Sequence, residues 1–215
     1  DDDLALDPDY LEQALRIAEE YPFLGAWGGI IEPRYEAPEL APPESQHALM
    51  GLRSAQQDLW SNDLNHHSST PWGGGLCVRR TVVMQYIEEL RSNPKRQGLD
   101  LQGTKRLFGG DTDIAYTACR LGMGKGVFTR LRVEHMIPAS KCSIEHLCRS
   151  AEGRGYSEIL HHYLLYGSLP SQQVGLQQWA RKLLLWRKQS PLERKVTEAF
   201  ERGRFEAYAD LGRRS

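Results

Sequence analysis

The first apolar positions of the chain recur at helical spacing. Leu11, Leu15 and Ala18 lie about one turn apart, and Pro22 follows as a natural end point. The preceding segment 9–12 (DYLE) has the form of a capping box, in which two side chains satisfy free N–H groups of the first turn. The pattern therefore predicts a helix that ends before Pro22, with these three residues on its apolar face.

Two later segments have the pattern of strands. Residues 24–31 (LGAWGGII) form a short apolar run with glycines, which is typical of a buried strand. Residues 126–134 alternate between apolar and polar positions, and the pair Ile137-Pro138 closes that element. A third segment, 72–78 (WGGGLCV), is apolar with three glycines, so it predicts either a strand or a tight turn.

The segments between these strands predict helices and loops. Residues 81–90 have helical character, and residues 111–121 predict a helix that stops at Gly122. The apolar face of that helix consists of Ile114, Ala115, Ala118 and Leu121. Residues 32–47, which hold four prolines, and the polar residues 92–106 predict loops.

The order of these elements predicts an α/β fold, with a mixed sheet flanked by helices. From Ser143 onward the pattern is almost entirely helical, and the composition changes near residue 150. We therefore expect an α/β body over residues 1–150 and a helical C-terminal extension over residues 151–215.

Charge and cysteine content narrow the class of protein. The net charge of −1 gives no reason to expect a nucleic acid partner. Residues 1–150 hold 16 Lys and Arg against 21 Asp and Glu, whereas residues 151–215 hold 11 against 7, so only the second part is basic. No apolar run approaches the roughly 18 residues of a membrane span. Four cysteines without a CxxC pair favour free thiols in the cytoplasm.

Three consecutive carboxylates, Asp1 to Asp3, open the chain. Because like charges repel, such a triplet needs either solvent or a cation to screen it. Hard divalent cations such as Mg²⁺ and Mn²⁺ take carboxylate and phosphate oxygens as ligands. The triplet therefore indicates a metal site, with a solvated acidic terminus as the alternative.

Three further groups of residues carry candidate chemistry. Asp111, after Gly110, could accept a proton at a helix start, although there it could equally be an N-cap beside Asp113. His135 ends a strand and could complete a metal site, or be a hydrogen-bonded structural residue. The segment 72–75 (WGGG) places a tryptophan beside open backbone, which suits stacking on a sugar as well as close core packing.

Six sequence blocks in order resemble the inverting family 2 glycosyltransferases of the GT-A fold, over most of residues 1–157. The blocks are DDD (1–3), DPDYLEQAL (7–15), EEYPFLGAWGG (19–29), PWGGGLCVRR (71–80), GGDTDIAYTACRLG (109–122) and VEHMIPAS (133–140). The resemblance implies transfer of a sugar, with inversion, from a nucleoside-diphosphate sugar to a hydroxyl of a saccharide, lipid-linked or other acceptor.

The resemblance also implies roles for individual residues. The donor diphosphate and its divalent cation, Mg²⁺ or Mn²⁺, would be bound by Asp1, Asp2 and Asp3, with Asp1, Asp3 and His135 as metal ligands. Asp111 would be the catalytic base. The acceptor side would consist of Trp72, Gly73, Gly74, Gly110 and Asp113. Gly110 departs from the acidic residue that is commoner before the base, which puts an acceptor contact in doubt.

In that family a Rossmann-like segment that binds the nucleoside precedes the metal motif. We therefore expect about a hundred such residues upstream, and we expect residues 1–215 alone to be inactive. Two alternatives stay open at this point. One is a nucleotide-sugar-binding protein without catalysis, and the other is a nucleotidyltransferase. Neither the donor, the acceptor nor the oligomeric state follows from the sequence.

The basic C-terminal part could touch a membrane surface. Leu176, Ala180, Leu183 and Leu184 would line one helical face, near Trp179 and Trp186, and the basic residues are Arg181, Lys182, Arg187 and Lys188. Such a helix could rest on the inner face of the membrane, where lipid-linked acceptors occur. The alternative is that its apolar face packs on the rest of the protein or on another subunit.

Overall fold

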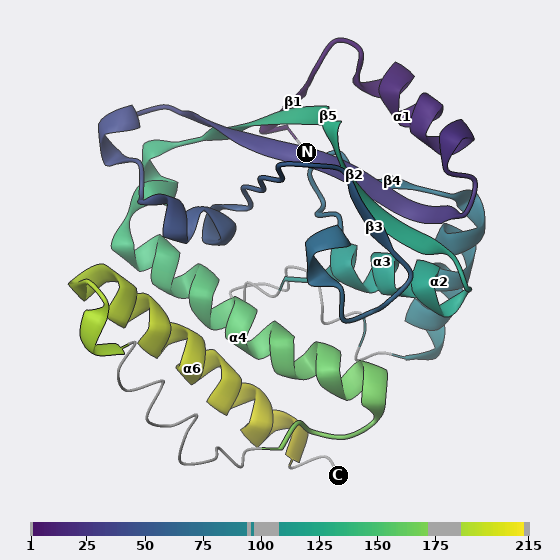
Figure 1. Cartoon of the computed structure of the whole chain (residues 1–215). Coiled ribbons are helices and arrows are strands. Elements are labelled where there is room, and N and C mark those ends of the chain that lie inside the picture. The colour runs from purple at the N-terminus through teal and green to yellow at the C-terminus, as the bar shows by residue number, and fades with distance from the viewer. Residues whose placement is uncertain (1, 94–95, 97–107, 172–185, 213–215) are drawn as a thin grey trace. The chain divides into compact units, whose positions relative to one another are not determined.

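The computed structural model describes residues 2–93, 96, 108–171 and 186–212 (Figure 1). The chain divides into two compact units, the first comprising Asp1–Gln97 and Gly109–Cys142 and the second comprising Gly98–Phe108 and Ser143–Ser215. The first unit is a mixed α/β structure and the described part of the second is helical, so the α/β class predicted from the sequence is confirmed. The C-terminal segment of the second unit begins at Ser143.

The first unit is built on one mixed sheet. Its strands are β1 (Leu4–Leu6), β2 (Leu24–Tyr35), β3 (Leu59–Ser61), β4 (Cys77–Val78) and β5 (Gly124–Ile137). The order is β1-β5-β2-β4, with β3 also paired to β5. Only the central pair, β2 and β5, is parallel. Both predicted strands are thus confirmed, and they are the two longest strands of the sheet.

The parallel pair contains an irregularity at Gly29. Pairing runs from Gly29–Phe128 directly to Ile30–Arg132, so that β5 contributes extra residues at this point. A Cβ atom on Gly29 would overlap the main chain of Leu131. Because only glycine permits this approach, the bulge lets β5 bend while it stays paired with β2.

Helix α1 (Tyr10–Glu20) confirms the first predicted helix but buries a different face. The buried residues are Tyr10, Ala14 and Ile17, which pack against Trp27, Phe128 and Leu131 of the sheet. Leu11 and Leu15 are 69% and 68% exposed. The predicted face was wrong for the two leucines, because Tyr10, Ala14 and Ile17 follow the same helical spacing and reach the sheet. The third predicted residue, Ala18, is partly buried and packs against this core.

The predicted capping box at the start of α1 is also absent. The side chain of Asp9 makes no cap hydrogen bond, and its carboxylate accepts a hydrogen bond from Gln13 Nε2 at 2.9 Å instead. Glu12 pairs with Arg16 one turn later. Both carboxylates therefore bind side chains along the helix rather than the free N–H groups of its first turn.

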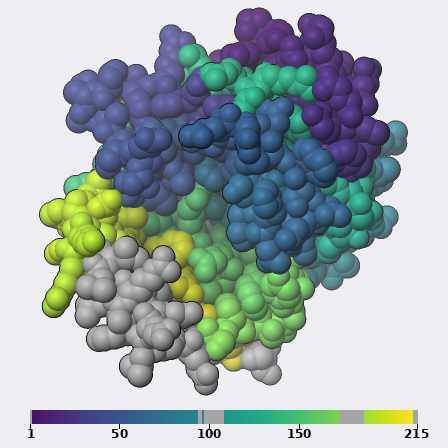
Figure 2. Space-filling view, in the orientation of Figure 1, coloured from purple at the N-terminus to yellow at the C-terminus, as the bar shows by residue number. Residues whose placement is uncertain are grey.

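Helices α2 (Arg80–Ser92) and α3 (Gly110–Arg120) confirm the next two helical predictions. A second apolar cluster joins them to β2, through Val82, Ala115, Ala118 and Ala26. Of the residues expected on the face of α3, Leu121 lies beyond the helix end and is 44% exposed. In the space-filling view, the purple residues of the N-terminal part lie against teal residues of β5 (Figure 2).

Two predicted loops differ from the structure in part. Strand β2 continues through Pro33 to Tyr35, and the following residues contain 3-10 helices at Pro38–Leu40 and Glu44–Met50. The segment 72–78 is mostly a turn, and only Cys77–Val78 pair with β2. The predicted loop 92–106 lies largely outside the described residues.

The second unit contains the helices α4 (Ile144–Tyr166) and α6 (Pro191–Gly212). Ser143 caps α4, since its hydroxyl accepts a hydrogen bond from the His146 N–H at 3.2 Å. The apolar residues Ile159, Leu160, Ala207 and Leu211 join the two helices. Most of the basic amphipathic helix proposed for the C-terminal part, including Leu176, Ala180 and Leu183, lies outside the described residues.

Candidate functional site

The pairing of β1 with β5 brings Asp3 to His135. Leu4 is directly opposite His135, and the Met136 N–H donates to the Asp3 carbonyl oxygen at 2.8 Å, which extends the ladder by one residue. This register places the imidazole Nε2 of His135 3.2 Å from Oδ2 of Asp3. Two residues that the sequence predicted as metal ligands, 132 positions apart, therefore meet at one end of the sheet.

Lys141 is a third member of this group, which we call the Asp3 cluster (Asp3, His135 and Lys141). It lies in the 3-10 helix Ala139–Cys142, just after the end of β5, and its Nζ is 2.8 Å from Oδ2 of Asp3. The hydrogen bond from Lys141 holds the pKa of Asp3 below its ordinary value, against the opposing effect of burial, and His135 adds to the lowering. Nothing in the local sequence pattern had indicated Lys141.

The Asp3 cluster fits part of the coordination shell of a divalent cation. Ligands at about 2.1 Å in adjacent octahedral positions lie about 3.0 Å apart, close to the 3.2 Å between the His135 nitrogen and the Asp3 oxygen. Such cations often have one or two protein carboxylates and take the remaining ligands from phosphates and water. Among the described residues no group of three or more His, Cys, Asp or Glu side chains forms a complete metal site. Asp2 is exposed, and Asp1 lies outside the described residues.

Asp111 lies at the start of α3, facing the loop that follows Trp72. Its Oδ2 accepts a hydrogen bond from the Gly73 N–H at 2.7 Å, and Oδ1 accepts one from the Thr112 N–H at 2.6 Å. The N-cap position belongs to Gly109, whose φ of 126° suits glycine. The alternative role of Asp111 as N-cap is therefore wrong, and its half-buried carboxylate is oriented towards the Gly73 loop.

Arg53 places a positive charge beside Asp111 and Trp72. Its guanidinium carbon lies 5.0 Å from the centre of the Trp72 ring, and its Nη2 donates to the Ser68 carbonyl oxygen at 2.7 Å. Burial lowers the pKa of Arg53 to about 10, and the charge of Asp111 opposes this lowering. Arg53 therefore stays charged at neutral pH and attracts the Asp111 carboxylate.

The loop over residues 73–75 connects the start of β1, next to the Asp3 cluster, with Asp111. A Cβ atom on Gly74 would lie 2.8 Å from Ile31 and 3.7 Å from Leu4, the residue after Asp3. Gly73 in turn holds Asp111. The predicted glycines therefore let the backbone pass between the start of β1 and the start of α3.

The segment from Gly51 to Arg53 forms a second connection. A Cβ atom on Gly51 would lie 3.8 Å from the His135 ring, while Arg53 interacts electrostatically with Asp111. Residues two positions apart are separated by roughly 7 Å at most. This segment therefore lies beside the His135 ring at one end and carries the charge that acts on Asp111 at the other.

The other predicted acceptor-side residues lie deeper in the first unit. Asp113 is 1% exposed, and its two carboxylate oxygens accept hydrogen bonds from Arg96 at 2.5 and 2.6 Å. Gly110 is buried within the first turn of α3. An acceptor contact by Asp113 would therefore require the Arg96 ion pair to break.

Some of the remaining sequence predictions concern the cysteines and the membrane. All four cysteines are free, and burial raises the pKa of Cys77, Cys119 and Cys142, which makes them poor nucleophiles at neutral pH. Among the described helices, none is both long enough and apolar enough to cross a membrane.

The chain matches no known protein family, no characterised protein and no solved structure at a significant level. A function therefore has to be argued from the mixed α/β fold and from the residues that this fold brings together.

Proposed function

We propose that this protein is a metal-dependent glycosyltransferase that inverts the anomeric centre, with the GT-A fold as its architecture. The observation that carries the proposal is the meeting of separate segments. Asp3 and His135 come together through the sheet, and Asp111 faces the same region through the Gly73–Gly74 turn. A ligand pair for a cation beside an oriented carboxylate is the arrangement that sugar transfer from a nucleoside diphosphate requires.

The roles of the side chains follow from their chemistry. Asp3 and His135 would hold a divalent cation, which when bound neutralises the charge of the leaving diphosphate. Asp111, held by two backbone N–H groups, accepts the proton of the acceptor hydroxyl as its oxygen attacks the anomeric carbon. Trp72, fixed by Arg53, offers an aromatic face to a sugar ring. A single displacement of this kind inverts the configuration.

The base assignment is tested with Asp111→Asn in the intact protein. We expect turnover to fall roughly 10²- to 10⁴-fold, the usual contribution of a general base. Release of nucleoside diphosphate from a panel of nucleoside-diphosphate sugars, with Mn²⁺ or Mg²⁺ and saccharide or lipid-linked acceptors, measures this effect. Asparagine has the same shape as aspartate, and its side-chain oxygen can still accept the hydrogen bond from the Gly73 N–H, so the fold should persist.

Asp9→Asn is the matched control, because Asp9 is exposed and, among the described residues, its carboxylate binds the neighbouring Gln13 side chain alone. Its turnover should equal that of the unmodified protein. Near-normal turnover of a folded Asp111→Asn protein would contradict the base assignment. Metal-dependent binding of a nucleoside diphosphate without any transfer would favour the binding-protein alternative, and release of pyrophosphate from a nucleoside triphosphate would favour a nucleotidyltransferase.

A further inference from the structure

Lys141 and His135 contact the same oxygen atom of Asp3. The ammonium Nζ is 2.8 Å from Oδ2, and the imidazole Nε2 is 3.2 Å from it. The three side chains are partly shielded from solvent, with exposed fractions of 30% for Lys141, 13% for His135 and 36% for Asp3. One carboxylate oxygen therefore already has a positive partner where the proposed cation would bind.

An ammonium group and a divalent cation do not share one carboxylate oxygen easily. Both are positive, and at such a short separation their repulsion is strong even where solvent screens it. Lysine has a flexible four-carbon stem, so its charge can move several ångströms without any change in the backbone. The mobile partner is therefore Lys141, whereas His135 is fixed by its place in β5.

We propose that Lys141 exchanges partners when the site is loaded. In the free protein its ammonium pairs with Asp3 and competes with the cation. In the loaded protein it leaves Asp3 and binds the phosphate oxygens of the donor, which gather near the cation. Lys141 is thus both a competitor for the metal site and a ligand of the diphosphate, an inference that rests on the proposed function.

The exchange predicts opposite effects on two binding constants in Lys141→Gln. Free Mn²⁺, followed by electron paramagnetic resonance, should bind more tightly by about threefold to fivefold, because a partly exposed charge pair of this size no longer competes. Inorganic pyrophosphate, added with saturating Mn²⁺, should bind roughly tenfold more weakly, because a charge-assisted hydrogen bond is lost. Pyrophosphate presents two phosphates without a base, so the unknown nucleoside does not matter.

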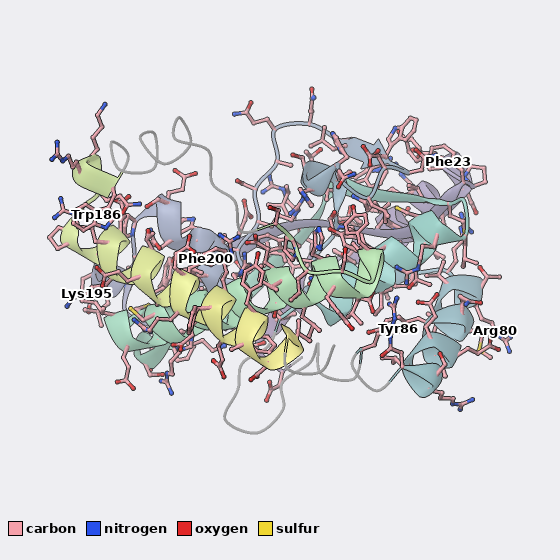
Figure 3. The ribbon with its side chains drawn as sticks, turned by 90° about the horizontal axis from the view of Figure 1, so that it is seen from below. Phe23, Arg80, Tyr86, Trp186, Lys195 and Phe200 are labelled. Carbon is pink, nitrogen blue, oxygen red and sulfur yellow. The ribbon has the colours of Figure 1, made fainter. Side chains whose placement is uncertain are left out.

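Two variants serve as controls in the intact protein. Lys195→Gln removes an exposed lysine from α6 and should change neither constant (Figure 3). Lys141→Arg keeps the positive charge and should follow the unmodified protein in both measurements. If Lys141→Gln were to unfold, Lys141→Met would take its place, because methionine keeps much of the apolar stem without the charge and should shift the two constants in the same opposite directions.

Any other combination of changes in the two binding constants contradicts the proposed exchange. Unchanged or weaker Mn²⁺ binding in Lys141→Gln would show that the ammonium does not compete, and unchanged pyrophosphate binding would show that it does not reach the phosphates. Failure of the proposed function would look different, because it would appear as normal sugar transfer by Asp111→Asn or as no transfer by the unmodified protein, whereas the exchange is measured by the two binding constants of Lys141→Gln.

Discussion

At the scale of single residues, Tyr10 links the first helix to the loop that orients Asp111. Its hydroxyl donates a hydrogen bond to the carbonyl oxygen of Gly75, whose φ of 75° requires a residue without a Cβ atom. A side chain on Gly75 would also collide with the Tyr10 ring. Tyr10 is 2% exposed, so this contact holds the turn from the core side.

Removal of this hydroxyl should have a pH-dependent effect. Burial raises the pKa of Tyr10 above its ordinary value of 10.0. The unfolded chain therefore ionises first as the pH rises, and the stabilisation, complete below pH 10, is lost above it. We expect Tyr10→Phe to lower the free energy of unfolding by about 1–3 kcal/mol at pH 8, because the Gly75 carbonyl loses its partner. The difference from the unmodified protein should shrink as the pH rises above 10.

Denaturant unfolding at several pH values between 8 and 11 measures that difference. Tyr166→Phe is the control, because Tyr166 is 52% exposed on α4, and its effect should be small throughout. A penalty for Tyr10→Phe that stayed constant up to pH 11 would show that the Tyr10 proton has no part in the stability.

The residues of the site were predictable only where a motif marked them. Asp3, Asp111 and His135 stand in recognisable blocks, and the structure places each beside a partner that the sequence had also indicated or allowed. Lys141 and Arg53 were missed because each becomes relevant only through contacts distant in sequence, to Asp3 and to Trp72. Their local surroundings carry no pattern that separates them from ordinary surface cations.

At the scale of elements, α4 and α6 approach each other at two glycines. A Cβ atom on Gly155 would overlap the carbonyl oxygen of Phe200, and one on Gly203 would overlap that of Glu152. From there the apolar contacts advance along both helices to Ile159 and Ala207, so the two helices run parallel, as the green and yellow helices in Figure 1 show. Their packing therefore combines close backbone contact at the two glycines with large apolar side chains in the following turns.

This contact makes Gly203→Ala strongly destabilising. Alanine normally favours a helix over glycine by about 1 kcal/mol, but here the methyl group meets main-chain atoms that cannot turn away. We expect a net loss of about 1–3 kcal/mol in the second unit, within the range of overpacked cores. Thermal unfolding followed by circular dichroism measures it.

Gly212→Ala is the matched control at the end of α6, where a Cβ atom would only make ordinary contact with Leu169 at 3.8 Å. That variant should be neutral or slightly more stable. Equal melting temperatures for Gly203→Ala and Gly212→Ala would mean that the close approach of the helices is relaxed in solution.

Helices and strands were largely predictable because apolar spacing is a local property of the chain. The pattern gave the existence of α1, α2, α3, β2 and β5, but it placed Leu11 and Leu15 of α1 on the buried face, where Tyr10, Ala14 and Ile17 lie instead. Neighbouring strands, the bulge at Gly29 and the division at Ser143 were not predictable, because each depends on which distant segments meet.

At the scale of the whole molecule, the candidate site lies within one unit. The Asp3 cluster, Asp111 and Arg53 all belong to the first unit, whereas the glycine contact between α4 and α6 belongs to the second. Changes that affect residues without shared partners usually act independently. Stability of the helical unit and ligand binding by the α/β unit should therefore respond to different substitutions.

If the Asp3 cluster binds a cation as proposed, this separation predicts that Gly203→Ala leaves that binding intact. Below the melting temperature of the variant, its affinity for Mn²⁺ should equal that of the unmodified protein, while Asp3→Asn should lose roughly tenfold or more because a charged ligand is gone. Electron paramagnetic resonance of Mn²⁺ measures both. A large loss of affinity in Gly203→Ala would show that the helical unit supports the metal site.

The pairing of β2 and β5 also has a consequence for the order of events during folding. Leu24 pairs with Gly124, and Leu4 pairs with His135, so these pairings join segments that are about a hundred residues or more apart in the sequence. Contacts this distant form slowly, since a long loop must close before they are gained. During synthesis the ribosome has to release the chain past Ile137 before Asp3 can meet its partners. The contact between Asp3 and His135 is therefore among the last features to form, so a chain that stalls earlier lacks the proposed ligand pair.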